Sequence, residues 1–162
     1  STGALTFLSA PDFEANGSAD GNNTYVVEVN ATDDGAGALT VVQTITIEVT
    51  NLLDQPPEFV WTVANVTATF DVNVTVTEPD TFVIDLNATD PDSPITGYLF
   101  SGGIDQILFE INATGALAFK NAPDFEIPTS QQGSNTYYVD VNATDGVNSV
   151  TQSIAVQVLD LD

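Results

Sequence analysis

The sequence predicts an all-β protein built of β-sandwich repeats in tandem, of which the first is incomplete. Apolar residues recur at every second position over several stretches, which is the period of a strand with one buried face. The chain also repeats itself with a period of about 110 residues, the size of one β-sandwich module. No stretch has the 3.6-residue period of an amphipathic helix.

Three pairs of segments define the internal repeat. TGALTFLSAPDFE returns as TGALAFKNAPDFE, NTYVVEVNATD as NTYYVDVNATD, and VVQTITIEV as VTQSIAVQV. The pairs, shifted by 112, 112 and 109 positions, are 2–14 with 114–126, 23–33 with 135–145, and 41–49 with 150–158. We therefore expect 1–53 to be the C-terminal half of one repeat and 54–162 to be a complete repeat.

Four stretches of the complete repeat alternate as strands do, and each has an expected inward face. Those faces are Val66, Ala68, Phe70, Val72, Val74 and Val76; Phe82, Ile84, Leu86 and Ala88; Tyr137, Val139, Val141 and Ala143; and Ile154, Val156 and Val158. In the opening half repeat, the matching apolar residues would be exposed. Either earlier residues of the same polypeptide cover them, or strands from another subunit do.

Composition limits the partners and the chemistry. Of 162 residues 43% are apolar, enough for a folded core, yet 23 acids face one base, Lys120, for a net charge of −22. This charge argues against nucleic acid or an anionic membrane as a partner, and no apolar stretch is long enough for membrane insertion. Because Cys and His are absent, a metal would bind through oxygen, which favours calcium.

Eight of the thirteen asparagines begin an N-x-[ST] sequon, where random placement would give roughly two to three. They are Asn16, Asn22, Asn30, Asn65, Asn73, Asn87, Asn112 and Asn142. Those that fall in strands occupy the outward phase, where a glycan has room. The pattern predicts a glycosylated, extracellular or cell-surface chain.

Acids gather where strands end and where the repeats join. The segments VNATD, LNATD and VNATD close three strands with Asp33, Asp90 and Asp145, and Asp92 follows Asp90 in a D-P-D pair. Such recurring carboxylates suit a shared cage of oxygen ligands for calcium, which takes six to eight oxygens. For scattered acids such as Asp20, a solvated acidic surface is the better interpretation.

These motifs resemble those of cadherin repeats, especially microbial cadherin-like modules of large surface proteins, over the whole chain. The resemblance rests on Glu78 in VTVTE, the two PDFE segments, ATDPD, the later NATD segments and the linker NLLDQ. It implies a Greek-key sandwich and calcium ligands at Asp12, Glu14, Asp33, Asn51, Asp54, Glu78, Asp90, Asp92, Asp124, Glu126, Asp145, Asp160 and Asp162. The linker departs from the family at Asn51 and Leu53, so one calcium position at this join is expected to be weak or empty.

We therefore expect a calcium-stiffened, N-glycosylated structural or adhesive repeat of a secreted rod, stalk or fibre. Its partners would be neighbouring repeats or copies of the same protein. One alternative is a calcium-dependent carbohydrate-binding module, which would need an exposed aromatic platform, whereas the nine Phe are mostly at expected core positions. The lone Trp61 is expected to pack near the join and not to stack on a sugar. A more remote alternative is a glycosidase using Asp90 and Asp92 as its carboxylate pair.

Overall fold

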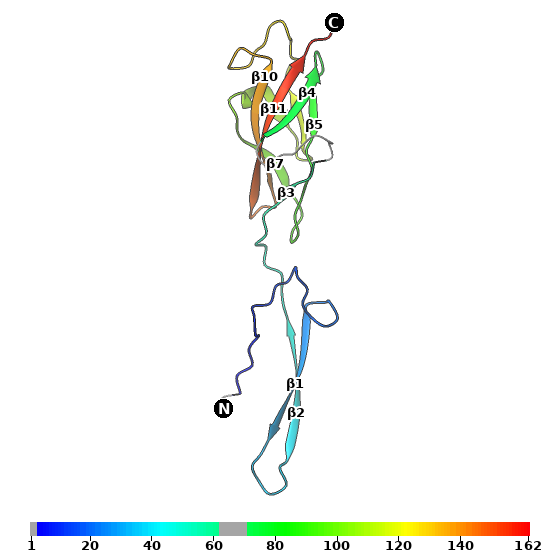
Figure 1. Ribbon diagram of the computed structural model, residues 1–162, viewed down its shortest axis with the longest axis vertical. Coiled ribbons are helices and arrows are strands. Elements are labelled where there is room, and N and C mark those ends of the chain that lie inside the picture. Colours follow the sequence, from blue (N-terminus) through cyan, green and yellow to red (C-terminus); the bar gives the residue numbers. More distant parts are fainter. Residues whose placement is uncertain (1–2, 62–70) are drawn as a thin grey trace. The chain divides into compact units, whose positions relative to one another are not determined.

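All regular elements in the described residues, 3–61 and 71–162, are β-strands except for one short 3-10 helix (Figure 1). The structure is a computed structural model, and it confirms the all-β class. The chain divides into two units, Ser1–Leu52 (unit 1) and Leu53–Asp162 (unit 2). None of the described residues forms a helix suited in length and hydropathy to crossing a membrane.

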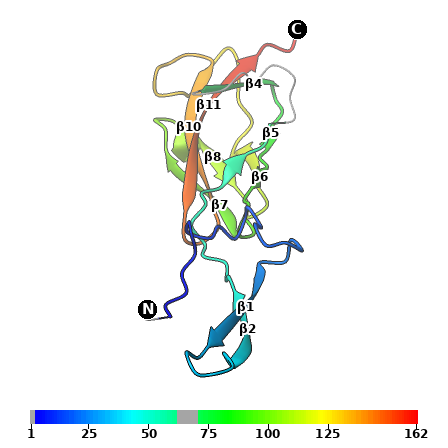
Figure 2. The same cartoon turned by 60° about the horizontal axis from the view of Figure 1, so that its bottom comes forward.

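Unit 1 contains a single hairpin (Figure 2). Strand β1, Thr24–Thr32, pairs antiparallel with β2, Thr40–Glu48, and this register sets Tyr25 opposite Ile47 and Val27 opposite Ile45. Apolar residues face each other at these positions because both strands alternate with the same phase. The sheet has two strands only, so each strand has one edge without a strand partner among the described residues.

Unit 2 contains two main sheets and a short strand pair. One sheet has the order β4-β11-β10-β7, with β4 parallel to β11 and the other pairs antiparallel, and the other sheet has the order β5-β9-β8. Strand β3 pairs with β6. The bounds are β3 Glu58–Phe59, β4 Asp71–Thr77, β5 Phe82–Asp85, β6 Ala88–Thr89, β7 Gly97–Gly102, β8 Phe109–Ile111, β9 Ala116–Phe119, β10 Thr136–Thr144 and β11 Ser149–Leu159, with the 3-10 helix η1 at Gln106–Leu108.

The core of unit 2 is lined by alternate residues from both main sheets. Phe119 packs its ring 4.4 Å from Phe109 and 5.1 Å from Tyr137, measured between ring centroids. The inward faces predicted for β10 and β11 are confirmed, since each of those residues is buried. In β4, Val72 and Val76 are buried as predicted, whereas Val66, Ala68 and Phe70 lie outside the described residues.

One inward assignment is wrong. Phe82 is exposed and its neighbour Val83 is buried, the reverse of the predicted phase. The pairing of β5 with β9 shifts register between Phe82 and Ile84. A bulge of this kind adds a residue to one strand and so inverts the alternation on one side of it. Beyond the shift, Leu86 and Ala88 return to the predicted inward phase.

Candidate metal centre

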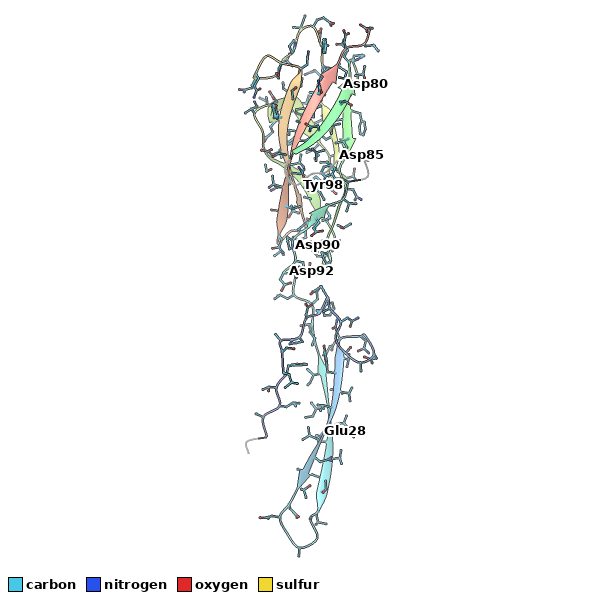
Figure 3. The ribbon with its side chains drawn as sticks, in the orientation of Figure 1. Glu28, Asp80, Asp85, Asp90, Asp92 and Tyr98 are labelled. Carbon is cyan, nitrogen blue, oxygen red and sulfur yellow. The ribbon has the colours of Figure 1, made fainter. Side chains whose placement is uncertain are left out.

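Three carboxylates meet at one end of unit 2. Asp90 and Asp92 come from the loop after β6 (Figure 3). Asp145 follows the last residue of β10. Each offers an oxygen, and these oxygens all lie within 4.8 Å of one another. We call Asp90, Asp92 and Asp145 the aspartate cluster. The sequence predicted all three as metal ligands, and the fold brings them together although Asp145 is far from the others in sequence.

The Asp-Pro-Asp-Ser turn fixes one side of this cluster. Asp90 Oδ1 accepts hydrogen bonds from the backbone N–H groups of Asp92, at 3.0 Å, and Ser93, at 2.9 Å. Aspartate favours such turns because its short side chain reaches the backbone two or three residues ahead. The turn also brings the Ser93 hydroxyl to 3.4 Å from Asp90 Oδ1.

A second turn fixes Asp145 and connects it to the first. Asp145 Oδ1 accepts the backbone N–H groups of Val147, at 2.6 Å, and Asn148, at 2.5 Å. Its Oδ2 accepts the Ser93 hydroxyl at 3.1 Å. All these donors are neutral. The chain's one base, Lys120, donates to the Ile107 carbonyl at 2.8 Å instead. The cluster therefore concentrates negative charge that no basic side chain compensates.

The linker at the start of unit 2 contacts this cluster through backbone groups. Asp92 Oδ2 accepts the N–H groups of Asp54, at 2.8 Å, and Gln55, at 2.9 Å. Asn148 Nδ2 donates to the carbonyls of Leu53, at 3.3 Å, and Gln55, at 3.1 Å. Asp54, whose carboxylate is predicted as a ligand, accepts a hydrogen bond at Oδ1 from Gln55 Nε2 at 3.2 Å. What Asp54 gives the cluster directly is its backbone N–H.

These bonds keep Asp92 and Asp145 ionised. The backbone N–H of Gln55 lowers the pKa of Asp92 most, and it outweighs the opposing effect of burial. Burial raises the pKa of Asp145, but the bonds from Val147, Asn148 and Ser93 together lower it below its ordinary value. Both groups are carboxylates at neutral pH, because their pKa values lie below the 3.8 of an unperturbed aspartate.

Asp90 Oδ2 provides the test of whether a metal fits. This oxygen is buried and accepts no hydrogen bond from the described residues. A buried carboxylate oxygen without a partner is costly unless it is protonated or coordinates a cation. The cluster supplies carboxylate oxygens, and the Ser93 hydroxyl lies within hydrogen-bond distance of Asp90 and Asp145; such oxygens are the ligands that calcium takes. The residues present therefore fit a hard divalent cation, with Asp90, Asp92 and Asp145 as its ligands.

A second, more open cluster lies beyond the opposite end of β11. Glu78, Glu126 and Asp160 bring carboxylate oxygens within 4.8 Å of one another. Glu78 Oε2 accepts the N–H of Phe125 at 2.6 Å, which anchors the second PDFE segment to the end of β4. Since β11 has 11 residues, its two ends are separated by about 35 Å.

The remaining predicted ligands fall outside both clusters. Asp124 Oδ1 accepts the N–H of Ile127 at 2.8 Å, and Asp12 Oδ1 accepts that of Ala15 at 2.9 Å, so both close local turns. Asp33 Oδ1 accepts the N–H of Leu39 at 2.9 Å. Glu14, Asp33, Asn51 and Asp162 are exposed. The acids of unit 1 lack the counterparts of Asp90 and Asp92, which belong to the half repeat that 1–53 does not contain.

Sequence reasoning missed two polar residues that build the aspartate cluster. Ser93 connects Asp90 to Asp145 across 52 positions, and Asn148 connects the linker to the loop after β10 across 93 and 95 positions. The D-P-D-S sequence is a signal for the turn that places Ser93. No local signal marks Asn148, since its role depends on which loops the fold brings together.

The described sequon asparagines are all accessible. Asn16, Asn22, Asn30, Asn73, Asn87 and Asn112 are exposed and Asn142 is half-buried, while Asn65 lies outside the described residues. Asn112 sits in a tight turn, where its Oδ1 accepts both the N–H and the hydroxyl of Thr114, at 3.0 and 2.8 Å. Trp61 stacks on Phe59 at 5.6 Å and packs against the core, so its ring is not a free aromatic platform.

Solved structures with the same fold are all-β extracellular domains. Protocadherin gamma B7 extracellular cadherin domains 1–4 are 26% identical, with a TM-score of 0.69 over 93% of this chain and 34% of that chain. Protocadherin gamma B2 extracellular cadherin domains 1–5 are 27% identical, with a TM-score of 0.67 over 93% of this chain and 27% of that chain. Mouse cadherin-23 EC22–24 is 21% identical, with a TM-score of 0.64 over 95% of this chain and 46% of that chain.

The chain thus spans about a third and about a quarter of the two protocadherin chains, and under half of the cadherin-23 chain. The sequence matches no model of an established protein family. The likeness in structure nonetheless extends over more than nine-tenths of this chain and agrees with the motifs quoted from the sequence. The chain is a cadherin-like module, an all-β Greek-key sandwich preceded by half of another.

Proposed function

We propose that this chain is a calcium-stiffened, N-glycosylated extracellular repeat with a structural or adhesive role in a rod, stalk or fibre. The observation that carries the proposal is the aspartate cluster, with its buried and partnerless Asp90 Oδ2. Extracellular adhesion is the setting of the cadherin domains that this chain resembles. A role without catalysis agrees with the use of Asp90 Oδ1 and Asp145 Oδ1 as acceptors for backbone turns.

The position of the aspartate cluster at the start of unit 2 supports the proposed stiffening. A short linker between modules bends freely unless something fixes its backbone. Here Asp92 holds the N–H groups of residues 54 and 55, and Asn148 holds the carbonyls of residues 53 and 55. A bound calcium ion would neutralise three carboxylates that otherwise repel one another. It would thereby hold together the loop after β6 and the loop after β10, which bind the linker.

Glycans would cover the outward faces of the strands. Asn73 in β4 and Asn142 in β10 point away from the core, as their alternation with buried valines requires. A sugar on such a position blocks the approach of another sheet and so protects the module from aggregation. Peptide mapping of native material should find sugar at Asn73 and Asn142. Bare asparagines at both positions would refute the glycosylation.

Calcium titration tests the metal site. Extracellular modules hold calcium with a Kd of roughly 10⁻⁴–10⁻³ M, and at about 100 times Kd the ion would add roughly 2.7 kcal/mol to the free energy of unfolding. We expect calorimetric binding and a higher melting temperature in calcium. Asp90→Asn should lose most of both effects.

Glu110→Gln is the matched control, since Glu110 is exposed on β8 and outside both clusters. It removes one negative charge, as Asp90→Asn does, but should leave the calcium response intact. A melting temperature that calcium does not change, or an equal loss in the two variants, would contradict a specific site.

A further inference from the structure

We propose that the glycan on Asn142 packs its first sugar against Leu99, so that this glycan is held on the sheet and does not project freely into solvent. The inference rests on the proposed glycosylation and adds to it a named contact within the protein. Leu99 acts as a positioning residue for the sugar, and the sugar in turn shields Leu99 from water.

Asn142 and Leu99 are direct neighbours on the outward face of the four-stranded sheet. Strand β10 pairs with β7 in a register that sets Asn142 opposite Leu99, and with β11 in a register that sets Asn142 opposite Thr151. Residues directly opposite each other in antiparallel strands have Cβ atoms about 4.5–5.5 Å apart. A sugar joined to the Asn142 amide therefore begins within reach of the Leu99 side chain.

A hydrogen bond turns the Asn142 amide toward β7. The Thr151 hydroxyl, which lies on the β11 side, donates to Asn142 Oδ1 at 2.5 Å. The oxygen and the nitrogen point to opposite sides of a planar amide group, so Nδ2 is directed away from β11 and toward β7. Nδ2 is the atom to which an N-linked sugar is attached. The glycan therefore leaves the sheet on the side where Leu99 lies.

The Leu99 side chain offers apolar surface that the sugar would cover. It is 62% exposed, whereas its neighbours in the strand, Tyr98 and Phe100, pack against the core. On the outward face it lies between Gly97 and Ser101, which are too small to cover it, and β7 is the edge strand of its sheet among the described residues. A pyranose ring carries C–H bonds on its faces and hydroxyls at its rim. One face therefore removes apolar surface from water while the rim stays hydrated.

The same arrangement occurs twice in this chain, which distinguishes it from an isolated exposed leucine. In unit 1 the counterpart of Asn142 is Asn30, and it lies opposite Val42, which is 54% exposed. Val42 is on the outward face of its hairpin, which the second sheet of a sandwich does not cover. Each of these two equivalent sequons thus has an exposed aliphatic side chain directly beside it.

Asn73 provides a contrast within the same sheet. In β4 it lies opposite Ala155, which is only 8% exposed. An alanine in that position offers a sugar little apolar surface to cover. We therefore expect a glycan on Asn73 to project into solvent, and the contact with protein to be a property of Asn142 and not of every sequon on this face.

Nuclear Overhauser effects between sugar and methyl protons test the contact. The chain is expressed in a glycosylating host with isotopically labelled leucine, and peptide mapping establishes whether Asn142 carries sugar. We expect cross-peaks between ring protons of the first sugar and the Leu99 methyl groups. We also expect Leu99→Ser to speed enzymatic release of the Asn142 glycan from the folded chain at least threefold. Leu161→Ser is the matched control, since Leu161 is 61% exposed beyond the end of β11, and it should leave this rate unchanged.

The outcomes separate this contact from the glycosylation itself. A bare Asn142 would overturn both. Sugar on Asn142 that gives no cross-peaks to Leu99, or that is released equally fast from the Leu99→Ser variant and the parent chain, would overturn the contact and leave the glycosylation standing. Cross-peaks from Leu99 to a second copy, seen in a mixture of labelled and unlabelled chains, would assign this face to self-association and would also overturn the contact.

Discussion

The two hairpins of the molecule have related sequences, closely so in β1 and β10 and less so in β2 and β11, and they differ in their surroundings. β1 and β10 are both nine residues long, begin at equivalent Thr residues, and set their Tyr opposite Ile47 and Val156 respectively. Local sequence is therefore sufficient for the pairing and its register. Burial, in contrast, does not follow from the local sequence. Leu117 and Phe119 are core residues in unit 2, whereas their counterparts Leu5 and Phe7 in unit 1 are exposed.

The partner sheet also affects strand length. β11 continues to Leu159, whose partner is Thr77 in β4, whereas β2 ends at Glu48, the counterpart of Gln157. The last two residues of β11 thus extend along a parallel neighbour that unit 1 lacks. The surroundings of the acids also differ between the two units. Asp145 lies beside Asp90 and Asp92, while its counterpart Asp33 is exposed.

The largest expected effect is a difference between two Leu→Ala variants. Leu117→Ala removes a fully buried side chain and should lower the free energy of unfolding of unit 2 by about 2–5 kcal/mol. Leu5→Ala changes an exposed side chain and should cost less than about 1 kcal/mol. Urea denaturation of each variant measures both values. Equal losses would mean that the face of unit 1 is already covered.

A second pair of variants compares the acids that end β1 and β10. Asp145→Asn removes a ligand from the aspartate cluster and should weaken calcium binding at least about tenfold, or roughly 1.4 kcal/mol. Asp33→Asn makes the same change at the equivalent position of unit 1 and should leave the affinity unchanged. Calorimetric titration separates the two, and an equal weakening would show that Asp33 is also a ligand.

Asn148→Ala sharpens the comparison at the linker. The change removes the hydrogen bonds to the carbonyls of Leu53 and Gln55, and should destabilise unit 2 by about 1 kcal/mol. It should also speed amide exchange at residues 54 and 55, while exchange in β1 and β2 stays as it was. Unaltered exchange in the linker would rule out a positioning role for Asn148.

The smallest effect is expected from pH in the absence of calcium. The folded pKa values of Asp92 and Asp145 lie below the ordinary 3.8, so the folded state binds fewer protons than the unfolded state near that pH. Their contribution to stability is therefore complete above about pH 4 and is lost as the pH falls through the lowered pKa values. Thermal melts of the double variant Asp92→Asn, Asp145→Asn should lose this part of the acid dependence.

Much of the fold follows from the sequence because alternation and repetition are local signals. The period of two predicted the inward faces of β10 and β11, whose residues are buried. Phe82 was wrongly predicted to face inward because the bulge depends on how β5 pairs with β9. No local pattern in 82–88 indicates this shift in register.

The sequence predicted which acids could form the candidate site, but it did not predict which of them come together. The motifs pointed to Asp90, Asp92 and Asp145, yet the same motifs also pointed to Asp12 and Asp124, whose side chains close local turns. Which carboxylates converge depends on contacts between loops distant in sequence. The backbone role of Asp54 and the contributions of Ser93 and Asn148 have the same origin.

The most direct test of the account is a crystal structure of the chain grown in saturating calcium, with anomalous data to locate the ion. The account predicts an anomalous peak in contact with Asp90 Oδ2 and with carboxylate oxygens of Asp92 and Asp145. A structure without such a peak, in which Asp90 Oδ2 instead accepts a hydrogen bond from water or from a protonated neighbour, would contradict it.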